Sequence, residues 1–128
     1  MSKIVEAINS MIKNSSLIED VAVTSEEFYN NMTYTYYFKY KSYIWSIEES
    51  RYNDNGGYDL IYYPGFTQVA DVIRYTQDKG MTEENYVKYD SSTLKTVEAD
   101  ESFTDLYRLV KEKLHNVDKV LDDIIADM

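Results

Sequence analysis

Bulky apolar side chains occupy every second position between residues 34 and 47, and their parity changes once, at residues 41–42. Successive side chains of a strand point to opposite faces of its sheet, so this alternation predicts strands with one apolar face. A tight hairpin centred on residues 41–42 pairs the positions that lie symmetrically on either side of it. All of these residues then share one face, as the pairs Tyr40 with Tyr43, Phe38 with Trp45 and Tyr36 with Ile47.

The alternation resumes after a strong turn signal, Asn-Asp-Asn-Gly-Gly at residues 53–57. Tyr58, Leu60 and Tyr62 continue the apolar face after a second change of parity, which predicts a three-stranded antiparallel meander. Residues 85–90 and 93–98 carry shorter apolar patterns that predict two further strands.

The segment before the meander is less regular. Residues 17–24 are predicted to contain a short strand. For residues 25–31, the capping-box spacing of Thr24 and Glu27 leaves two structures open, one helical turn or a long hairpin connection.

Helical periodicity marks residues 3–13, with Ser2 as a candidate N-cap, and residues 66–79, which end before Gly80. A third apolar stripe recurs every three or four positions from residue 103 to residue 128. These elements predict a single α+β domain over residues 1–128. In it, an antiparallel β-meander of three to five strands packs with an N-terminal helix, a middle helix and a long C-terminal helix.

The C-terminal stripe follows Asp100 or Ser102 as candidate N-caps. A straight helix from residue 103 to residue 128 would extend about 39 Å, more than a domain of this size usually measures. We therefore expect the helix to protrude, or to break near His115 and Asn116. Its stripe favours packing on the sheet, and a homodimer formed through this helix is the alternative to a monomer.

The second face of the meander is too apolar for an ordinary solvated face. The parity that buries Tyr36 and Phe38 sends Tyr37, Ile44, Ile61 and Tyr63 to the opposite side, with Glu48 and Asp59 beside them. Either another element covers this face or it contacts a partner. These six residues are the first candidates for partner binding.

The acidic net charge and the high tyrosine content indicate which kind of partner the chain would bind. The chain has 23 acidic and 13 basic residues, a net charge of −10, and 14 tyrosines. This charge opposes direct binding to nucleic acid or to an anionic membrane and favours a basic protein partner. Carboxylates pair with guanidinium groups while tyrosine rings stack on their flat faces, so Glu26, Glu27, Glu83 and Glu84, which lie near tyrosines, complete the candidate set. The competing interpretation is a second small core of tyrosines, with the acidic residues conferring solubility.

Catalytic motifs are missing from the sequence. It has no cysteine, no glycine-rich nucleotide loop and no hydrolase motif, and His115 is its one histidine. We expect no enzyme activity, no cofactor and no metal, with a metal-dependent enzyme built on converging carboxylates as a remote alternative. No signal peptide or membrane-spanning run is present, so we expect a cytoplasmic protein.

In size, charge and lack of motifs, the chain resembles the anti-CRISPR and anti-restriction proteins of phages, and also the immunity proteins that neutralise nuclease toxins. No residue motif defines those groups, so the resemblance assigns no residue a role. It implies an inhibitor that occupies a basic site on a nuclease or defence complex, with its carboxylates in place of phosphates. The alternative resemblance is to class I type III secretion chaperones, which are acidic and combine an N-terminal helix, a three-stranded stretch and further helices and strands.

Overall fold

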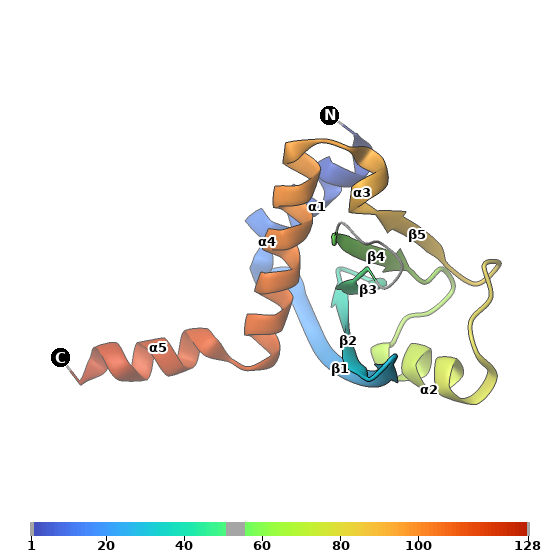
Figure 1. Cartoon of the computed structure of the whole chain (residues 1–128). Helices are drawn as coiled ribbons and strands as arrows, with labels where there is room; N and C mark the ends of the chain where they lie inside the picture. The colour runs from blue at the N-terminus through green and yellow to red at the C-terminus, as the bar shows by residue number, and fades with distance from the viewer. Residues whose placement is uncertain (1, 51–55, 128) are drawn as a thin grey trace.

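The antiparallel sheet, which the sequence predicts to have three to five strands, has five. The computed structural model describes residues 2–50 and 56–127, and in them the strands are antiparallel and follow one another in chain order (Figure 1). Helices precede, interrupt and follow the sheet, so the fold class is α+β, as predicted. The strands are β1 (Ile18–Phe28), β2 (Asn31–Tyr40), β3 (Tyr43–Glu49), β4 (Tyr58–Tyr62) and β5 (Val87–Asp90).

The register of β2 and β3 is the one that the change of parity predicts. Phe38 pairs with Trp45, and Tyr40 pairs with Tyr43 across the turn at residues 41–42. In the next strand, Leu60 pairs with Ile47 and extends the same face. Residues 53–55 of the turn predicted between β3 and β4 lie outside the described residues.

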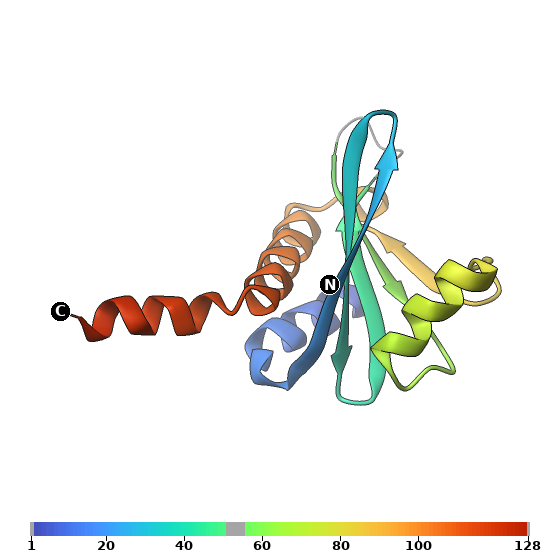
Figure 2. The same cartoon turned by 90° about the horizontal axis from the view of Figure 1, so that it is seen from below.

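Two helices close the apolar face of the sheet. α1 (Lys3–Lys13) and α4 (Val97–Leu114) lie on the same side of it (Figures 1 and 2). α1 has the predicted bounds, and the Ser2 hydroxyl accepts the Val5 backbone N–H at 3.3 Å, as an N-cap does. The side chains with no exposed surface in this main core are Ile8, Phe38, Ile47, Leu60, Phe103, Leu106 and Val110.

β1 is longer than predicted, and neither structure expected for residues 25–31 is present. After the single 3₁₀ turn η1 (Ser15–Leu17), the strand continues to residue 28 and returns through a two-residue turn. Tyr29 and Asn30 in that turn have φ values of 48° and 65°. Positive φ at both central positions matches the twist of a tight hairpin, so pairing with β2 outweighs the helical start signal at Thr24.

The segment at residues 93–98 is not a strand. It contains the end of α3 (Ser91–Leu94), a link at residues 95–96 and the start of α4, so α4 begins before the Asp100 or Ser102 that was predicted to cap it. Asp90 Oδ1 accepts the Ser92 N–H at 2.9 Å, and Thr96 Oγ1 accepts the Ala99 N–H at 3.0 Å. These two caps satisfy backbone N–H groups at the starts of α3 and α4. Their stabilisation of the helices outweighs the weak strand pattern of this segment.

The middle helix, α2 (Val69–Lys79), begins at Val69 and not at residue 66. It ends before Gly80, whose φ of 73° suits a glycine, as predicted. Four strands precede α2 and one follows it, which departs from the three-stranded stretch of the secretion chaperones.

The C-terminal stripe breaks where the sequence predicts. α4 ends at Leu114 and α5 (Val117–Ala126) begins after Asn116, whose φ and ψ of 56° and 41° are left-handed. The stripe packs on the sheet in α4, whereas α5 projects from the body (Figures 1 and 2). Across the described residues, the helices are too short or too polar for any of them to traverse a bilayer.

Candidate binding groove

α2 covers one half of the second sheet face (Figure 2). It buries a second, smaller core made of Tyr37, Ile44, Tyr63, Val69 and Val72. Ile44 has no exposed surface, and Tyr37 and Tyr63 keep 4% and 5%. Of the two alternatives for this face, cover by another element therefore holds for the half around Ile44, so Ile44 is not available to a partner. The turn at residues 64–65 folds the chain back after β4 and sets α2 on that half.

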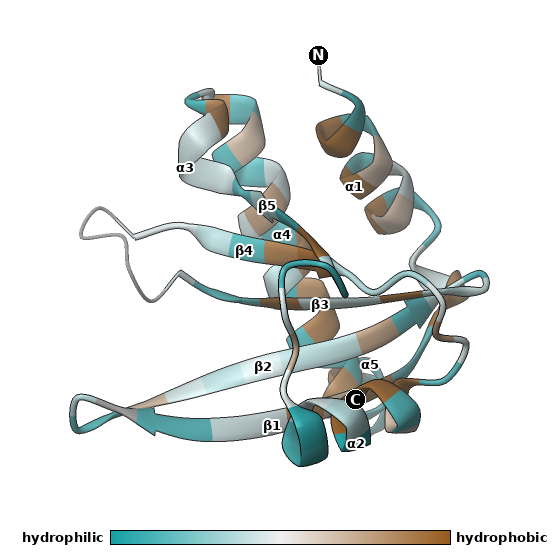
Figure 3. Cartoon of the chain, turned by 90° about the vertical axis from the view of Figure 1, so that its right-hand side faces the viewer, coloured by the Kyte–Doolittle hydropathy of each residue, from teal (hydrophilic) through white to brown (hydrophobic). Residues whose placement is uncertain are grey.

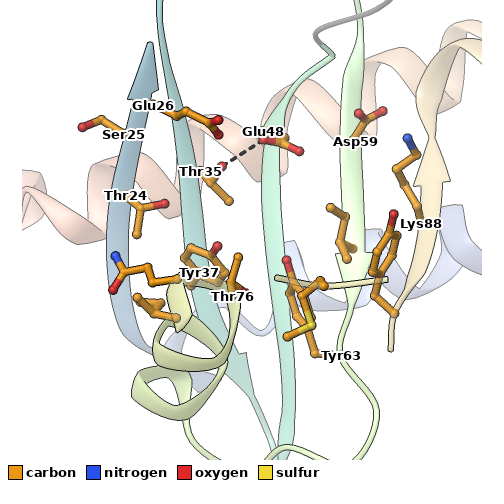
Figure 4. Close-up of a pocket in the computed structure, with 15 residues that line it drawn as sticks. Thr24, Ser25, Glu26, Thr35, Tyr37, Glu48, Asp59, Tyr63, Thr76 and Lys88 are labelled. Carbon is orange, nitrogen blue, oxygen red and sulfur yellow. Dashed lines mark hydrogen bonds between the residues drawn. The ribbon is translucent and has the colours of Figure 1, made fainter. Parts of the chain in front are cut away.

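The other half of the same face is polar, because the register aligns polar residues from all five strands. In this polar row, each residue is the cross-strand partner of the next: Thr24, Thr35, Glu48, Asp59 and Asp90. Figure 4 shows the first four on adjacent strands, with their side chains on the side that α2 occupies. The sheet thus changes from an apolar to a polar surface within one face.

This polar half and the last turns of α2 enclose a groove of about 550 Å³. Strands β1 to β4 form its floor, which is seen face-on in Figure 3, and β5 lies at one side. Among the described residues that line the groove, Glu26, Glu48 and Asp59 bring three carboxylates, against the single ammonium group of Lys88. Thr76 and Gln77 border it from the C-terminal end of α2, where the helix dipole is negative. The groove therefore carries a negative charge.

Two of the three carboxylates are direct cross-strand neighbours. Glu48 on β3 pairs with Asp59 on β4, and Asp59 keeps only 5% of its surface exposed. Like charges directly opposite each other destabilise a sheet. Thr35 donates a hydrogen bond to Glu48 at 2.9 Å and fixes that carboxylate in the groove.

Two tyrosines form the deep end of the groove, beneath α2. The Tyr37 and Tyr63 rings lie 6.0 Å apart, and the Tyr63 hydroxyl shares a buried hydrogen bond of 2.8 Å with Ser46. Burial raises the pKa of Tyr37 above its ordinary value of 10.0, a rise that the Glu48 carboxylate increases and the Thr24 hydroxyl partly offsets. Burial also raises the pKa of Tyr63, and Tyr37 and Glu48 add to that rise. Both phenols therefore stay neutral hydrogen-bonding groups at neutral pH.

The groove brings together six of the ten predicted partner-binding residues, Glu26, Tyr37, Glu48, Asp59, Ile61 and Tyr63. Ile44 lies under α2 and cannot reach a partner. Glu27 is exposed on β1 but outside the groove, and Glu83 and Glu84 are exposed in the turn between α2 and β5. The segment 83–84 is therefore a surface separate from the groove.

Sequence reasoning missed most of the hydroxyl groups and the lysine of the groove, which are Thr24, Ser25, Thr35, Thr76 and Lys88. A signal for Thr24 and Thr35 was present. A two-residue hairpin centred on Tyr29 and Asn30 pairs Thr24 with Thr35, by the symmetry that paired β2 with β3. Residues 24–28 are largely polar on both faces of the strand, so no alternation of apolar residues indicated that hairpin.

Within residues 2–50 and 56–127, no three histidine, aspartate or glutamate side chains are grouped closely enough to hold a metal ion. His115 is exposed at the end of α4. Comparisons of the chain with protein-family models, with curated proteins and with solved structures find no match.

Proposed function

We propose that this chain is a non-enzymatic binding protein whose acidic groove receives a basic side chain of a partner protein. The observation that carries the proposal is the composition of the groove, whose described lining has three carboxylates, Glu26, Glu48 and Asp59, and one lysine beside buried tyrosines. Such a site attracts cations by charge and holds them through carboxylate oxygens and hydroxyl groups.

Arginine fits the groove better than lysine. Its planar guanidinium group donates five N–H bonds in a fixed fork that matches a carboxylate, and it stacks on aromatic rings. The groove offers carboxylates on β1, β3 and β4, together with the exposed or half-buried hydroxyls of Ser25, Thr76 and Tyr86. Its volume of about 550 Å³ is ample for a side chain and its flanking backbone.

The biological effect that we propose is inhibition of a basic, nucleic-acid-handling partner such as a nuclease or a defence complex. A protein with a net charge of −10 is steered toward basic sites. Once an arginine that contacts phosphate is held in the groove, that arginine no longer binds nucleic acid. On this proposal the protein has no affinity of its own for DNA or RNA, and gel-shift assays at low salt would give no complex.

The groove is tested by calorimetric titration with a hexa-arginine peptide, using two variants of equal net charge. Glu26→Gln/Glu48→Gln removes two groove carboxylates, and Glu83→Gln/Glu84→Gln removes two exposed ones elsewhere. We expect the groove variant to lose about tenfold or more in affinity, since charged hydrogen bonds contribute about 1.5–3 kcal/mol. We expect the control to lose less than about threefold, since screening weakens distant charges. Equal losses in both variants would show that net charge alone attracts the peptide, and would refute the proposal that the peptide binds in the groove.

The partner itself is identified by the same pair of variants used as baits. A protein captured by the wild type and by Glu83→Gln/Glu84→Gln, but not by Glu26→Gln/Glu48→Gln, is bound through the groove. A nuclease or defence protein in that set supports inhibition, whereas an exported effector supports the chaperone alternative.

A further inference from the structure

α5 projects from the body on the side of the molecule away from the groove (Figure 2). None of its residues is buried, although every apolar residue in it except Ala126 falls on one side of the helix. Val120, Leu121, Ile124 and Ile125 keep 51%, 49%, 59% and 61% of their surface exposed. The same repeat packs on the sheet in α4, so its continuation in α5 is an apolar surface without a cover.

Charge borders this surface on both sides. At about 100° per residue, the apolar side chains of α5 occupy an arc of about 140° around the helix axis. Asp118 and Asp122 follow at one edge of the arc, and Asp123 and Asp127 at the other. The single basic residue of the helix, Lys119, lies on the opposite side. The stripe is therefore apolar along its centre and acidic along both edges.

This charge pattern opposes three possible covers. A second copy of α5 packed stripe to stripe would set aspartates against aspartates at the positions that normally carry interhelical salt bridges. A hollow of the described chain, about 480 Å³ between β1 and the α4–α5 junction, is lined by four acidic residues, among them Glu19 and Asp20, and by one lysine, Lys113. An anionic membrane surface would repel the four aspartates in the same way.

We propose that α5 docks an amphipathic basic helix of a partner protein, one whose apolar stripe is bordered on both sides by Lys or Arg. The apolar stripes would bury each other while the basic edges pair with Asp118 and Asp122 on one side and with Asp123 and Asp127 on the other. This surface is independent of the groove, because α5 lines no part of it.

The test uses the full chain and two synthetic peptides of three heptads, both with leucine at the a and d positions. One peptide carries lysine at e and g, and the other carries glutamate there. We expect the lysine peptide to bind at least about tenfold more tightly than the glutamate peptide at low salt, with the difference shrinking as salt rises. Equal affinity for the two peptides would refute the role of the aspartates.

Two double variants locate the binding on the stripe. Leu121→Ser/Ile124→Ser removes its centre, and we expect about a tenfold or greater loss of affinity for the lysine peptide. Lys119→Ser/Ala126→Ser places the same two serines on the opposite side. It replaces better helix formers and makes the helix more acidic, so it costs at least as much helicity without weakening attraction for the lysine peptide. Binding that survives in the stripe variant, or that both variants lose equally, would overturn the proposal.

Three further measurements on Leu121→Ser/Ile124→Ser exclude the other covers. We expect its melting temperature to equal that of the wild type, and a drop would show that the stripe packs on its own chain. We expect the wild type to sediment as a monomer, and a dimer that the variant abolishes would identify a second copy as the cover. We expect no binding to neutral phosphatidylcholine vesicles, and binding that depends on Leu121 and Ile124 would assign the stripe to a membrane.

Discussion

The two faces of the sheet are built from the same strands in the same register, yet they differ in the helices that cover them and in the polarity of their side chains. On the face toward α1 and α4, Phe38, Ile47 and Leu60 have no exposed surface and pack with Phe103 of α4. The face toward α2 is apolar only under that helix and then changes to the polar row that floors the groove. One face therefore stabilises the domain by burial, and the other gathers charged side chains around the groove.

The groove face holds its charge at some cost to stability. Glu48 and Asp59 are cross-strand neighbours of like charge, and Asp59 is almost fully buried. Arrangements that oppose folding are typical of sites kept for binding or catalysis, where function outweighs stability. We expect substitutions to affect the two faces differently, and the largest effect in the face toward α1 and α4, the closed face.

The largest effect is expected from Phe38→Ala in the closed face. Phe38 has no exposed surface and packs in the core that α1 and α4 share with the sheet, so its loss leaves a cavity and should lower the free energy of unfolding by about 3–5 kcal/mol. Ile61→Ala on the groove face removes a half-buried side chain and should cost about 1–2 kcal/mol. Urea denaturation of both variants measures the difference. Equal costs would mean that the two faces contribute alike to stability.

Alkaline pH should destabilise the groove face through its two buried tyrosines, and the opposite face through Tyr107, whose pKa burial also raises. Burial raises the pKa of Tyr37 and of Tyr63 in the folded protein, while the unfolded chain ionises both near 10. The stability that they contribute is complete below pH 10. It falls above that pH, because the unfolded state releases protons that the folded state keeps. Each tyrosine lowers the free energy of unfolding by about 1.4 kcal/mol per pH unit in that range.

Urea midpoints from pH 8 to 11.5 would show this decline, together with a rise in tyrosinate absorbance on unfolding. Tyr63→Phe should lose some stability at pH 8 with its hydrogen bond to Ser46, and its decline above pH 10 should be shallower by one proton. A slope unchanged by Tyr63→Phe would mean that this phenol ionises in the folded protein as it does in the unfolded chain.

How much of this could be predicted depends on whether one face of a segment is buried. The pairing of Phe38 with Trp45 followed from parity, because a strand with one buried face shows its period in the sequence. The far part of the β1–β2 hairpin projects beyond the rest of the sheet in Figure 2, and residues 25–28, whose β2 partners do not pair with β3, show no such period. The position of α2 was not predicted either, because alternation identifies an apolar face without indicating which element covers it.

A smaller effect is expected at the start of α4, the helix that packs on the closed face. Thr96→Ala removes the hydroxyl that accepts the Ala99 N–H at 3.0 Å, and should lower the free energy of unfolding by about 1 kcal/mol. Thr96→Ser keeps the hydroxyl and should retain most of that stability, as thermal denaturation would show. If serine and alanine were equally destabilising, the methyl group of Thr96 would matter and the cap would not.

The smallest effect, and the one opposite in sign, is expected from Glu48→Gln in the groove. The amide keeps an oxygen that accepts the hydrogen bond from Thr35, and it removes one of the two like charges that β3 and β4 place opposite each other. The free energy of unfolding should therefore rise by about 0.5 kcal/mol at low salt, the scale of cross-strand charge pairs. The gain should shrink in 0.5 M salt, because screening already weakens the repulsion in the wild type. Glu83→Gln, at an exposed turn outside the groove, is the matched control and should change stability by less than the groove variant. A loss of stability in Glu48→Gln would mean that the carboxylate supports the fold, and the contrast between a stabilising face and a binding face would fail at its central residue.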